Sequence, residues 1–274
     1  MNHDVITDVT AADVSRAVAG LGIIPGDTVL VHSSFKSMGH VSCGPAAIIQ
    51  GFEDVLGREG TLVMPTLSQV DFKNSYKTWY MDKPSDVGYI TEFFRKQPYV
   101  YRSNQATHSV AARGRRAYEL TFEHAAYGPH LCPFGEYAFA DSSPWMKMYQ
   151  GDTKVVFLGV TMKYNTMKHI AESRYVELLL SNVRDARICA ALEGRLGTFD
   201  REGVWPYYDG MQMQEALDSR GHITKSTCGN AELLCVSAME ACDIAFMLIS
   251  GNPENWYADE RLIWIKDCQA AAGC

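Results

Sequence analysis

His169 and Glu172 are the two residues of the chain whose types and spacing best suit proton transfer. They follow the apolar, β-branched run 154–160 and a short polar loop, an order that predicts strand, loop and helix. Residues three apart share one face of a helix, so a titratable imidazole lies beside a carboxylate. Because ligands of open α/β sheets bind beyond the carboxyl ends of strands, the pair predicts a general base and its partner.

The place of His169 early in this helix favours a neutral imidazole. The positive end of the helix dipole lowers the pKa of a nearby histidine, which leaves it basic near pH 7. A capping or packing role is the alternative. The sequence has no G-x-S-x-G elbow and no H-E-x-x-H pattern, so we expect neither a serine hydrolase nor a metal centre.

A second candidate is the loop 31–39, V-H-S-S-F-K-S-M-G, between a predicted strand and a predicted helix. Three serine hydroxyls, one lysine and the backbone N–H groups before a helix make a reasonable anion site. The loop has neither the Walker A nor the G-x-G-x-x-G pattern, and a polar turn without a ligand is the alternative.

Composition and charge limit the classes of function. The chain has 274 residues, 47% hydrophobic and 21% charged, which is ordinary for a folded protein. A formal net charge of −7 excludes a nucleic-acid footprint. The first residues lack a signal-peptide pattern and no apolar run reaches membrane-spanning length, so we expect a cytoplasmic protein without a membrane partner.

The eight cysteines include no C-x-x-C pair and are expected to be reduced thiols. Cys228, Cys235 and Cys242 recur every seven residues. On a helix this spacing places them along one side, as small buried residues.

The remaining elements predict an α/β fold. Strand, helix and strand within a short stretch form a βαβ unit, whose strands are parallel. The expected helices are 10–19, 44–57, 85–96, 115–123 and 230–248, the expected strands are 28–32, 60–66, 109–112 and 153–160, and 67–83 is a long surface loop.

Seven motifs, in this order, resemble the aminoglycoside 3-N-acetyltransferase family. They are V-H-S-S-F-K-S-M-G at 31–39, G-T-L-V-M-P-T at 60–66, the segments 83–95, 102–114, 128–135 and 142–147, and F-L-G-V-T-M-K-Y-N-T-M-K-H-I-A-E at 157–172. The resemblance implies one acetyltransferase domain over 1–274, with the more variable acceptor-binding part around 178–230. It implies a central mixed, largely parallel sheet flanked by helices, distinct from the GCN5 type.

The resemblance also implies the activity and its residues. Acetyl would pass from acetyl-CoA, without a metal, to the 3-amino group of a 2-deoxystreptamine aminoglycoside in a ternary complex, giving antibiotic resistance. His169 would be the base, Glu172 its partner or a substrate ligand, and Thr166 or nearby N–H groups would stabilise the oxyanion. Coenzyme A would contact His32, Ser33, Ser34, Lys36, Ser37, Met38, Gly39, Ser109 and Phe134. Carboxylates for the polycationic acceptor would be Asp71, Glu193, Asp200, Glu202 and Asp209.

Two other functions stay open at this point. The same fold and donor would serve an enzyme that acetylates another amine, because the resemblance is weakest where the acceptor would bind. A non-catalytic coenzyme A-binding protein is the other alternative, although such a protein has no need of a base. We expect a monomer or a homodimer.

Overall fold

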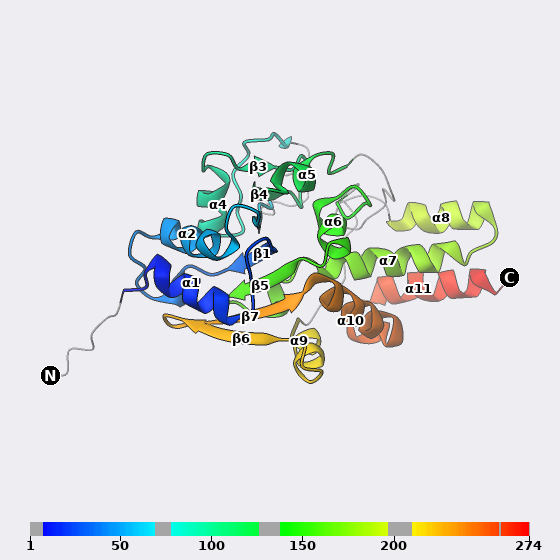
Figure 1. Cartoon of the computed structure of the whole chain (residues 1–274). Helices are drawn as coiled ribbons and strands as arrows, with labels where there is room; N and C mark the ends of the chain where they lie inside the picture. Colours follow the sequence, from blue (N-terminus) through cyan, green and yellow to red (C-terminus); the bar gives the residue numbers. More distant parts are fainter. Residues whose placement is uncertain (1–7, 69–77, 126–137, 197–209, 258, 274) are drawn as a thin grey trace.

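The computed structural model describes residues 8–68, 78–125, 138–196, 210–257 and 259–273, which form a mixed sheet with helices on both faces (Figure 1). The strands are β1 Thr28–Ser33, β2 Thr61–Pro65, β3 Tyr101–Arg102, β4 Val110–Gly114, β5 Lys154–Leu158, β6 Thr224–Cys228 and β7 Ala231–Ser237. The helices are α1 Ala11–Gly20, α2 Pro45–Leu56, α4 Tyr89–Arg95, α5 Ala117–Thr121, α6 Pro144–Gln150, α7 Lys168–Ser181, α8 Ala186–Leu196, α9 Gly210–Asp218, α10 Ala238–Gly251 and α11 Asp259–Ala272. Short 3-10 turns are η1 Lys36–Met38, η3 Met162–Tyr164 and η4 Pro253–Asn255.

The seven strands lie in the order β3-β4-β2-β1-β5-β7-β6. The predicted mixed sheet and the parallel βαβ unit are confirmed, since β1 pairs in parallel with both β2 and β5. The parallel part is smaller than expected, because the other four pairings are antiparallel. The two-residue turn Gly229-Asn230 joins β6 to β7, and so short a connection allows only antiparallel strands.

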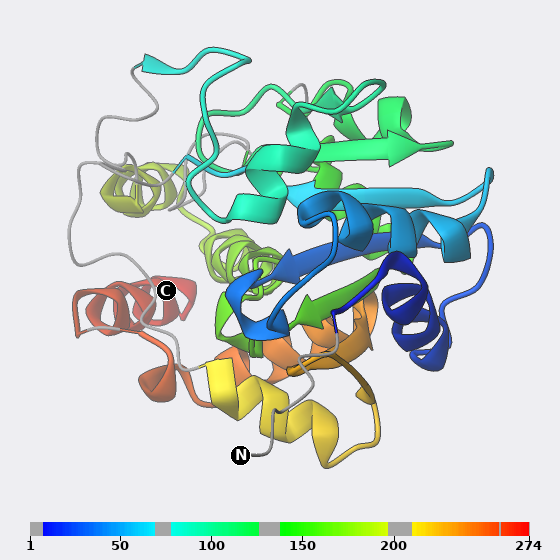
Figure 2. The ribbon, with the colours of Figure 1, turned by 90° about the vertical axis from the view of Figure 1, so that its left-hand side faces the viewer.

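Residues of the central strands alternate between two hydrophobic cores, which makes the molecule a three-layer α/β/α structure. Leu30 and Val155 pack into one core with α6, α7 and α10. Val31 and Val156 pack into the other with α1, α2 and α4, the side that faces the viewer in Figure 2. The two cores fix both faces of the sheet, and with them the loops at its carboxyl edge.

Local signals set the ends of the first helices as expected. Thr10 caps α1 in a capping box with Asp13, so both orphan donors of that helix end are satisfied. Pro45 occupies the first turn of α2, and Gly57 ends this helix at φ +63, a conformation that favours glycine.

The predicted helix 230–248 is wrong over its first part. Residues 231–237 form strand β7, and the helix begins only at Ala238. The cysteines spaced by seven therefore lie on three elements, with Cys228 in β6, Cys235 in β7 and Cys242 in α10. They are buried, as expected, and burial raises the pKa of Cys228 to about 11 and of Cys235 to about 12.

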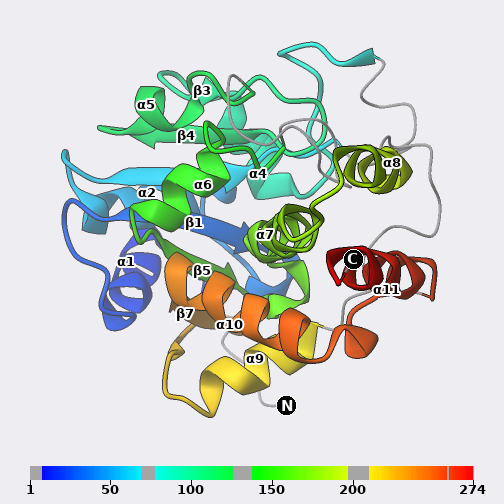
Figure 3. The ribbon, with the colours of Figure 1, turned by 90° about the vertical axis from the view of Figure 1, so that its right-hand side faces the viewer.

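Helices α7, α8 and α11 pack on one another and extend beyond the sheet, side by side in Figures 1 and 3. Within the described ranges no helix has the length and apolar character that crossing a membrane requires.

Candidate active site

A cavity of about 740 Å³ opens at the carboxyl ends of β1, β2 and β5, the edge where ligands of such sheets bind. Its walls come from the ends of these strands, from the segment before α4 and from the start of α7. The lining residues are His32, Ser33, Ser34, Phe35, Lys36, Pro65, Leu67, Val87, Gly88, Tyr89, Thr91, Gly159, Val160, Thr161, Lys163, Tyr164, Asn165, Thr166, Lys168 and His169.

The cavity is positively charged. Its described lining includes Lys36, Lys163 and Lys168 and no aspartate or glutamate. Lys168 is also buried, which lowers its pKa to about 8, although the nearby Glu172 carboxylate opposes the decrease. Below that pH the lysines give the cavity a field that suits a ligand carrying several negative charges.

His32 is the residue before the last of β1 and belongs to the lining of the cavity. Its ring stacks on Phe157 of the neighbouring strand β5, with centroids 5.3 Å apart and an interplanar angle of 13°. Burial lowers the pKa of His32 to about 3, because the imidazolium form would lose its hydration. His32 is therefore neutral at physiological pH.

His169 and Glu172 form a pair at the start of α7, as the sequence predicts. Nδ1 of His169 lies 2.5 Å from Oε2 of Glu172, and the exposed fractions of the two side chains are 14% and 1%. With Nδ1 donating to the carboxylate, the lone pair of a neutral imidazole is on Nε2. This arrangement orients Nε2 as the nitrogen that takes up a proton.

The pKa of His169 is lowered, in the predicted direction. The main cause is burial of the ring, and the Lys168 charge acts in the same sense. The Glu172 carboxylate acts against it and raises the pKa. The imidazole is thus neutral near pH 7, and Glu172 opposes part of the decrease that burial causes.

Two aromatic rings that the sequence analysis does not include among the site residues pack against the ring of His169. His108 is fully buried, and its ring is 5.7 Å from that of His169 at 81°. Phe139 lies 5.4 Å from His169 and 5.0 Å from His108. The sequence marks His108 only as a histidine in a loop, and nothing in its spacing indicates this contact. Lys163 and Lys168 are also cavity residues outside the predicted set.

The predicted coenzyme A residues fall into two groups. His32, Ser33, Ser34 and Lys36 line the cavity. The other described ones do not belong to its lining. Ser37 donates to the Ser34 carbonyl at 2.8 Å and fills the space beside Gly159, where a Cβ would overlap its hydroxyl. Met38 is buried in a core, and its carbonyl accepts from Asn230 N at 3.2 Å, next to Gly39. These residues therefore fix the shape of the loop.

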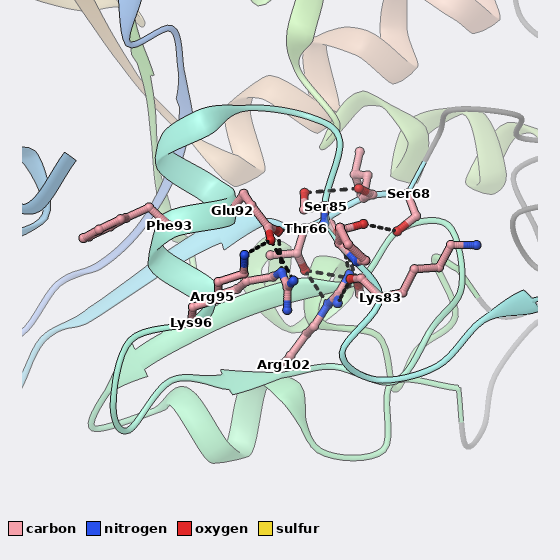
Figure 4. A network of polar contacts seen from close by, with 12 residues as sticks. Thr66, Ser68, Lys83, Ser85, Glu92, Phe93, Arg95, Lys96 and Arg102 are labelled. Atoms are coloured by element: carbon pink, nitrogen blue, oxygen red, sulfur yellow. Dashed lines mark hydrogen bonds and ion pairs between the residues drawn. The ribbon is translucent and has the colours of Figure 1, made fainter. Parts of the chain in front are cut away.

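Ser109 is fully buried and contacts a polar framework around Arg102. Figure 4 shows Arg102 of this framework beside Thr66. The Ser109 hydroxyl donates to the Thr66 carbonyl at 2.9 Å and accepts from Arg102 Nε at 3.2 Å. Arg102 also donates to the carbonyls of Thr66 and Met81, at 2.7 and 2.8 Å. The framework lies behind the cavity lining and joins the end of β2 to the segment that leads into α4, two parts of the chain that do supply lining residues.

Thr166 lines the cavity, and its carbonyl accepts from the backbone N–H of His169 at 3.1 Å. Glu193 is on α8 and does not belong to the lining of this cavity. Phe134, Asp71, Asp200, Glu202 and Asp209 lie outside the described residues. No group of three potential metal ligands occurs among the residues that the structure describes.

The fold and site define a class of protein: an α/β enzyme with a cation-lined cavity whose lining includes the histidine of a histidine–carboxylate pair. Residues 30–250 match the family model described as aminoglycoside 3-N-acetyltransferase. The chain belongs to this family. It is 28% identical to the SPbeta prophage-derived aminoglycoside N(3')-acetyltransferase-like protein YokD of Bacillus subtilis, over 86% of this chain and 90% of that protein. It is 32% identical to aminoglycoside N(3)-acetyltransferase III of Pseudomonas aeruginosa, over 60% and 63% of the two chains.

Solved structures show the same fold. The crystal structure of YokD superimposes with a TM-score of 0.68 at 24% identity, covering 90% of this chain and 95% of that one. The apoenzyme of aminoglycoside acetyltransferase AAC(3)-IVa gives 0.69 at 19% identity, with coverages of 97% and 99%. The binary complex of AAC-IIIb with CoASH gives 0.68 at 17% identity, with coverages of 92% and 99%.

Proposed function

We propose that this protein transfers acetyl from acetyl-CoA to the 3-amino group of 2-deoxystreptamine aminoglycosides and so confers antibiotic resistance in the cytoplasm. The observation that carries the proposal is the lysine-lined cavity that also contains His169, whose ring is paired with the buried Glu172 carboxylate. Family membership supplies the reaction class, and the solved relative with CoASH supports the donor.

The charge of the cavity supports coenzyme A as the donor. Coenzyme A carries a diphosphate and a ribose phosphate, which Lys36, Lys163 and Lys168 would neutralise. The hydroxyls of Ser33 and Ser34 would donate to its oxygens. The acetyl thioester would then lie toward the His169 end of the cavity.

The reaction follows from the orientation of His169. An ammonium group cannot attack a thioester, so the acceptor enters as the free amine. Its nitrogen forms a bond to the acetyl carbon while Nε2 of His169 takes a proton from that nitrogen. The Thr166 hydroxyl or a nearby N–H group stabilises the oxyanion. The C–S bond then breaks, and the imidazolium returns the proton to the departing thiolate.

The identity of the acceptor is the part of the proposal that rests most on family membership. A polycation needs carboxylates, and the described lining of the cavity has none. In the proposal the acceptor approaches His169 from outside the donor cavity, with Asp71, Glu193, Asp200, Glu202 and Asp209 as its candidate ligands. The missing carboxylates also favour one second candidate, acetylation of an amine with fewer positive charges.

A thiol-release assay with acetyl-CoA tests the proposal. The acceptor panel contains gentamicin-like and neomycin-like compounds, one analogue without the 3-amino group, and simple monoamines. Turnover that disappears with the analogue supports the reaction and its position. Turnover with monoamines alone supports the second candidate. Binding of coenzyme A without release of its thiol in the presence of any acceptor of the panel would contradict both candidate functions.

A further inference from the structure

Glu172 has one carboxylate oxygen that the histidine does not use. Oε2 pairs with Nδ1 of His169, whereas Oε1 is buried and has no hydrogen-bond partner among the described residues. Leaving a buried carboxylate oxygen without a donor is unfavourable. A donor on the interior side of α7 would therefore stabilise the pair.

Tyr257 lies on that side of α7. Glu172 and Tyr175 are three apart and share a face of the helix, and the ring of Tyr257 stacks on that of Tyr175, with centroids 6.5 Å apart and planes at 9°. The Tyr257 hydroxyl is buried, and within the described ranges no acceptor for its proton is found. The Arg261 guanidinium also acts on this hydroxyl, but it can only donate a hydrogen bond. The nearby charge of Glu172 contributes to the raised pKa of Tyr257, after the larger effect of burial.

Helix α11 also contacts the Tyr257 ring. The guanidinium of Arg261, itself fully buried, lies 5.3 Å from the centre of this ring and 4.6 Å from that of Trp264. Lys168 and His169 are the charged or titratable neighbours of Glu172, and Tyr175 and Arg261 are those of Tyr257. One step further out, His108 faces His169, and Glu254 and Cys268 act on Tyr175.

We propose that Tyr257 is a positioning residue, whose hydroxyl donates to Oε1 of Glu172 in the working enzyme. The inference rests on the proposed role of His169 as the base. The hydroxyl is a donor and the carboxylate oxygen an acceptor, so each supplies what the other lacks. Tyr257 thus holds Glu172 in the rotamer that keeps Oε2 on His169, and it withdraws part of the carboxylate charge from the imidazole.

The test is the titration of His169 in the whole protein without substrates, followed by NMR of ¹⁵N-labelled histidine rings. The signal of His169 is identified by its loss in His169→Asn. In Tyr257→Phe the full carboxylate charge faces the imidazole, so the pKa of His169 is expected to rise by roughly 0.5 to 1. Tyr175→Phe is the matched control, since it removes a hydroxyl from the other ring of the same stacked pair.

Two further measurements complete the test. In a Glu172→Gln background, Tyr257→Phe should no longer change the pKa of His169, because the carboxylate is gone. In the thiol-release assay, Tyr257→Phe should lower kcat about 3- to 10-fold with little change in KM. Titrations of Tyr257→Phe and Tyr175→Phe that both match the parent protein would overturn the inference. A shifted titration in a protein inert to every acceptor would leave it standing and contradict the proposed function.

Discussion

The two histidines of the cavity, one at the end of β1 and one at the start of α7, show how the same side chain acquires different properties. Burial lowers the pKa of both. At His32 nothing opposes this effect, and the pKa falls to about 3. At His169 the Glu172 carboxylate, 2.5 Å away, raises it again. Burial of an imidazole lowers its pKa, and a carboxylate beside the ring opposes that decrease.

The difference also separates the charges of the site. The negative charge beside His169 is shut inside the protein, where the Glu172 side chain is 1% exposed. The three lysines instead belong to the lining of the cavity. A ligand in the cavity therefore meets the positive charge of the lysines, while the buried Glu172 carboxylate remains beside His169.

The largest expected effect comes from His169→Asn, which removes the base and leaves the cavity lysines in place. Turnover in the thiol-release assay should fall about 10²- to 10⁴-fold, the usual contribution of a general base. Coenzyme A affinity, measured by calorimetry, should remain within about threefold of the parent value, because no phosphate contact is lost. If the variant kept the turnover of the parent protein, His169 would not be the base, and the functional difference drawn between it and His32 would be wrong.

Glu172→Gln makes His169 resemble His32, since it leaves the imidazole without a carboxylate. We expect kcat to fall about 10- to 100-fold, the usual effect of losing an orienting partner. The carboxylate raises the pKa of His169, so its removal lowers that pKa. The acidic limb of the kcat/KM profile should consequently move to lower pH. A limb that moves upward would contradict the role given to Glu172.

His32→Phe keeps the stacking on Phe157 and removes the titratable group, so it isolates the effect of burial. The pKa of His32 is about 3 when folded and 6.5 for the ordinary side chain, so the unfolded state binds more protons as the pH falls below 6.5. Between pH 7 and 5 this should remove about 2 kcal/mol of stability from the parent protein. Urea unfolding at pH 7 and pH 5 measures this loss, and the free energy of unfolding of the variant should decrease by about 2 kcal/mol less than that of the parent protein. Equal decreases in the two proteins would show that His32 is not buried in solution.

Lys36→Met removes a positive charge from the part of the cavity that follows β1 and leaves the residues at the start of α7 unchanged. Loss of one charged phosphate contact should reduce coenzyme A affinity about tenfold and leave the binding of pantetheine, which has no phosphate, unchanged. Lys225→Met is the matched control, because Lys225 pairs with Asp218 at 2.7 Å and does not belong to the cavity. Equal losses for coenzyme A and pantetheine would place Lys36 elsewhere than beside a phosphate.

The sequence predicts the elements whose signals are local. The βαβ unit, the helices expected over 10–19 and 44–57 and the pairing of His169 with Glu172 depend on residues close in the chain, and the structure confirms them. Strand β7 escapes prediction because the seven-residue spacing of its cysteine fits a helix equally well.

Other parts of the site depend on packing between distant segments. His108 contacts His169 only because the loop before β4 folds against α7, and Tyr257 reaches the same helix from the opposite side. Lys168 becomes a cavity residue through the turn that starts α7. No spacing within one segment encodes such contacts, so a single sequence does not reveal them.

The position of β7 in the sheet has a consequence for synthesis of the protein. Every described lining residue of the cavity precedes Glu172, so a ribosome has made all of them by the time α7 is complete. At that stage β5 is still an open edge, and α7 has not received α10, whose Cys242 thiol donates to the Met167 carbonyl at 3.2 Å. A chain that ends after α7 would therefore contain every described lining residue of the cavity, but it would leave β5 without its partner β7 and α7 without α10.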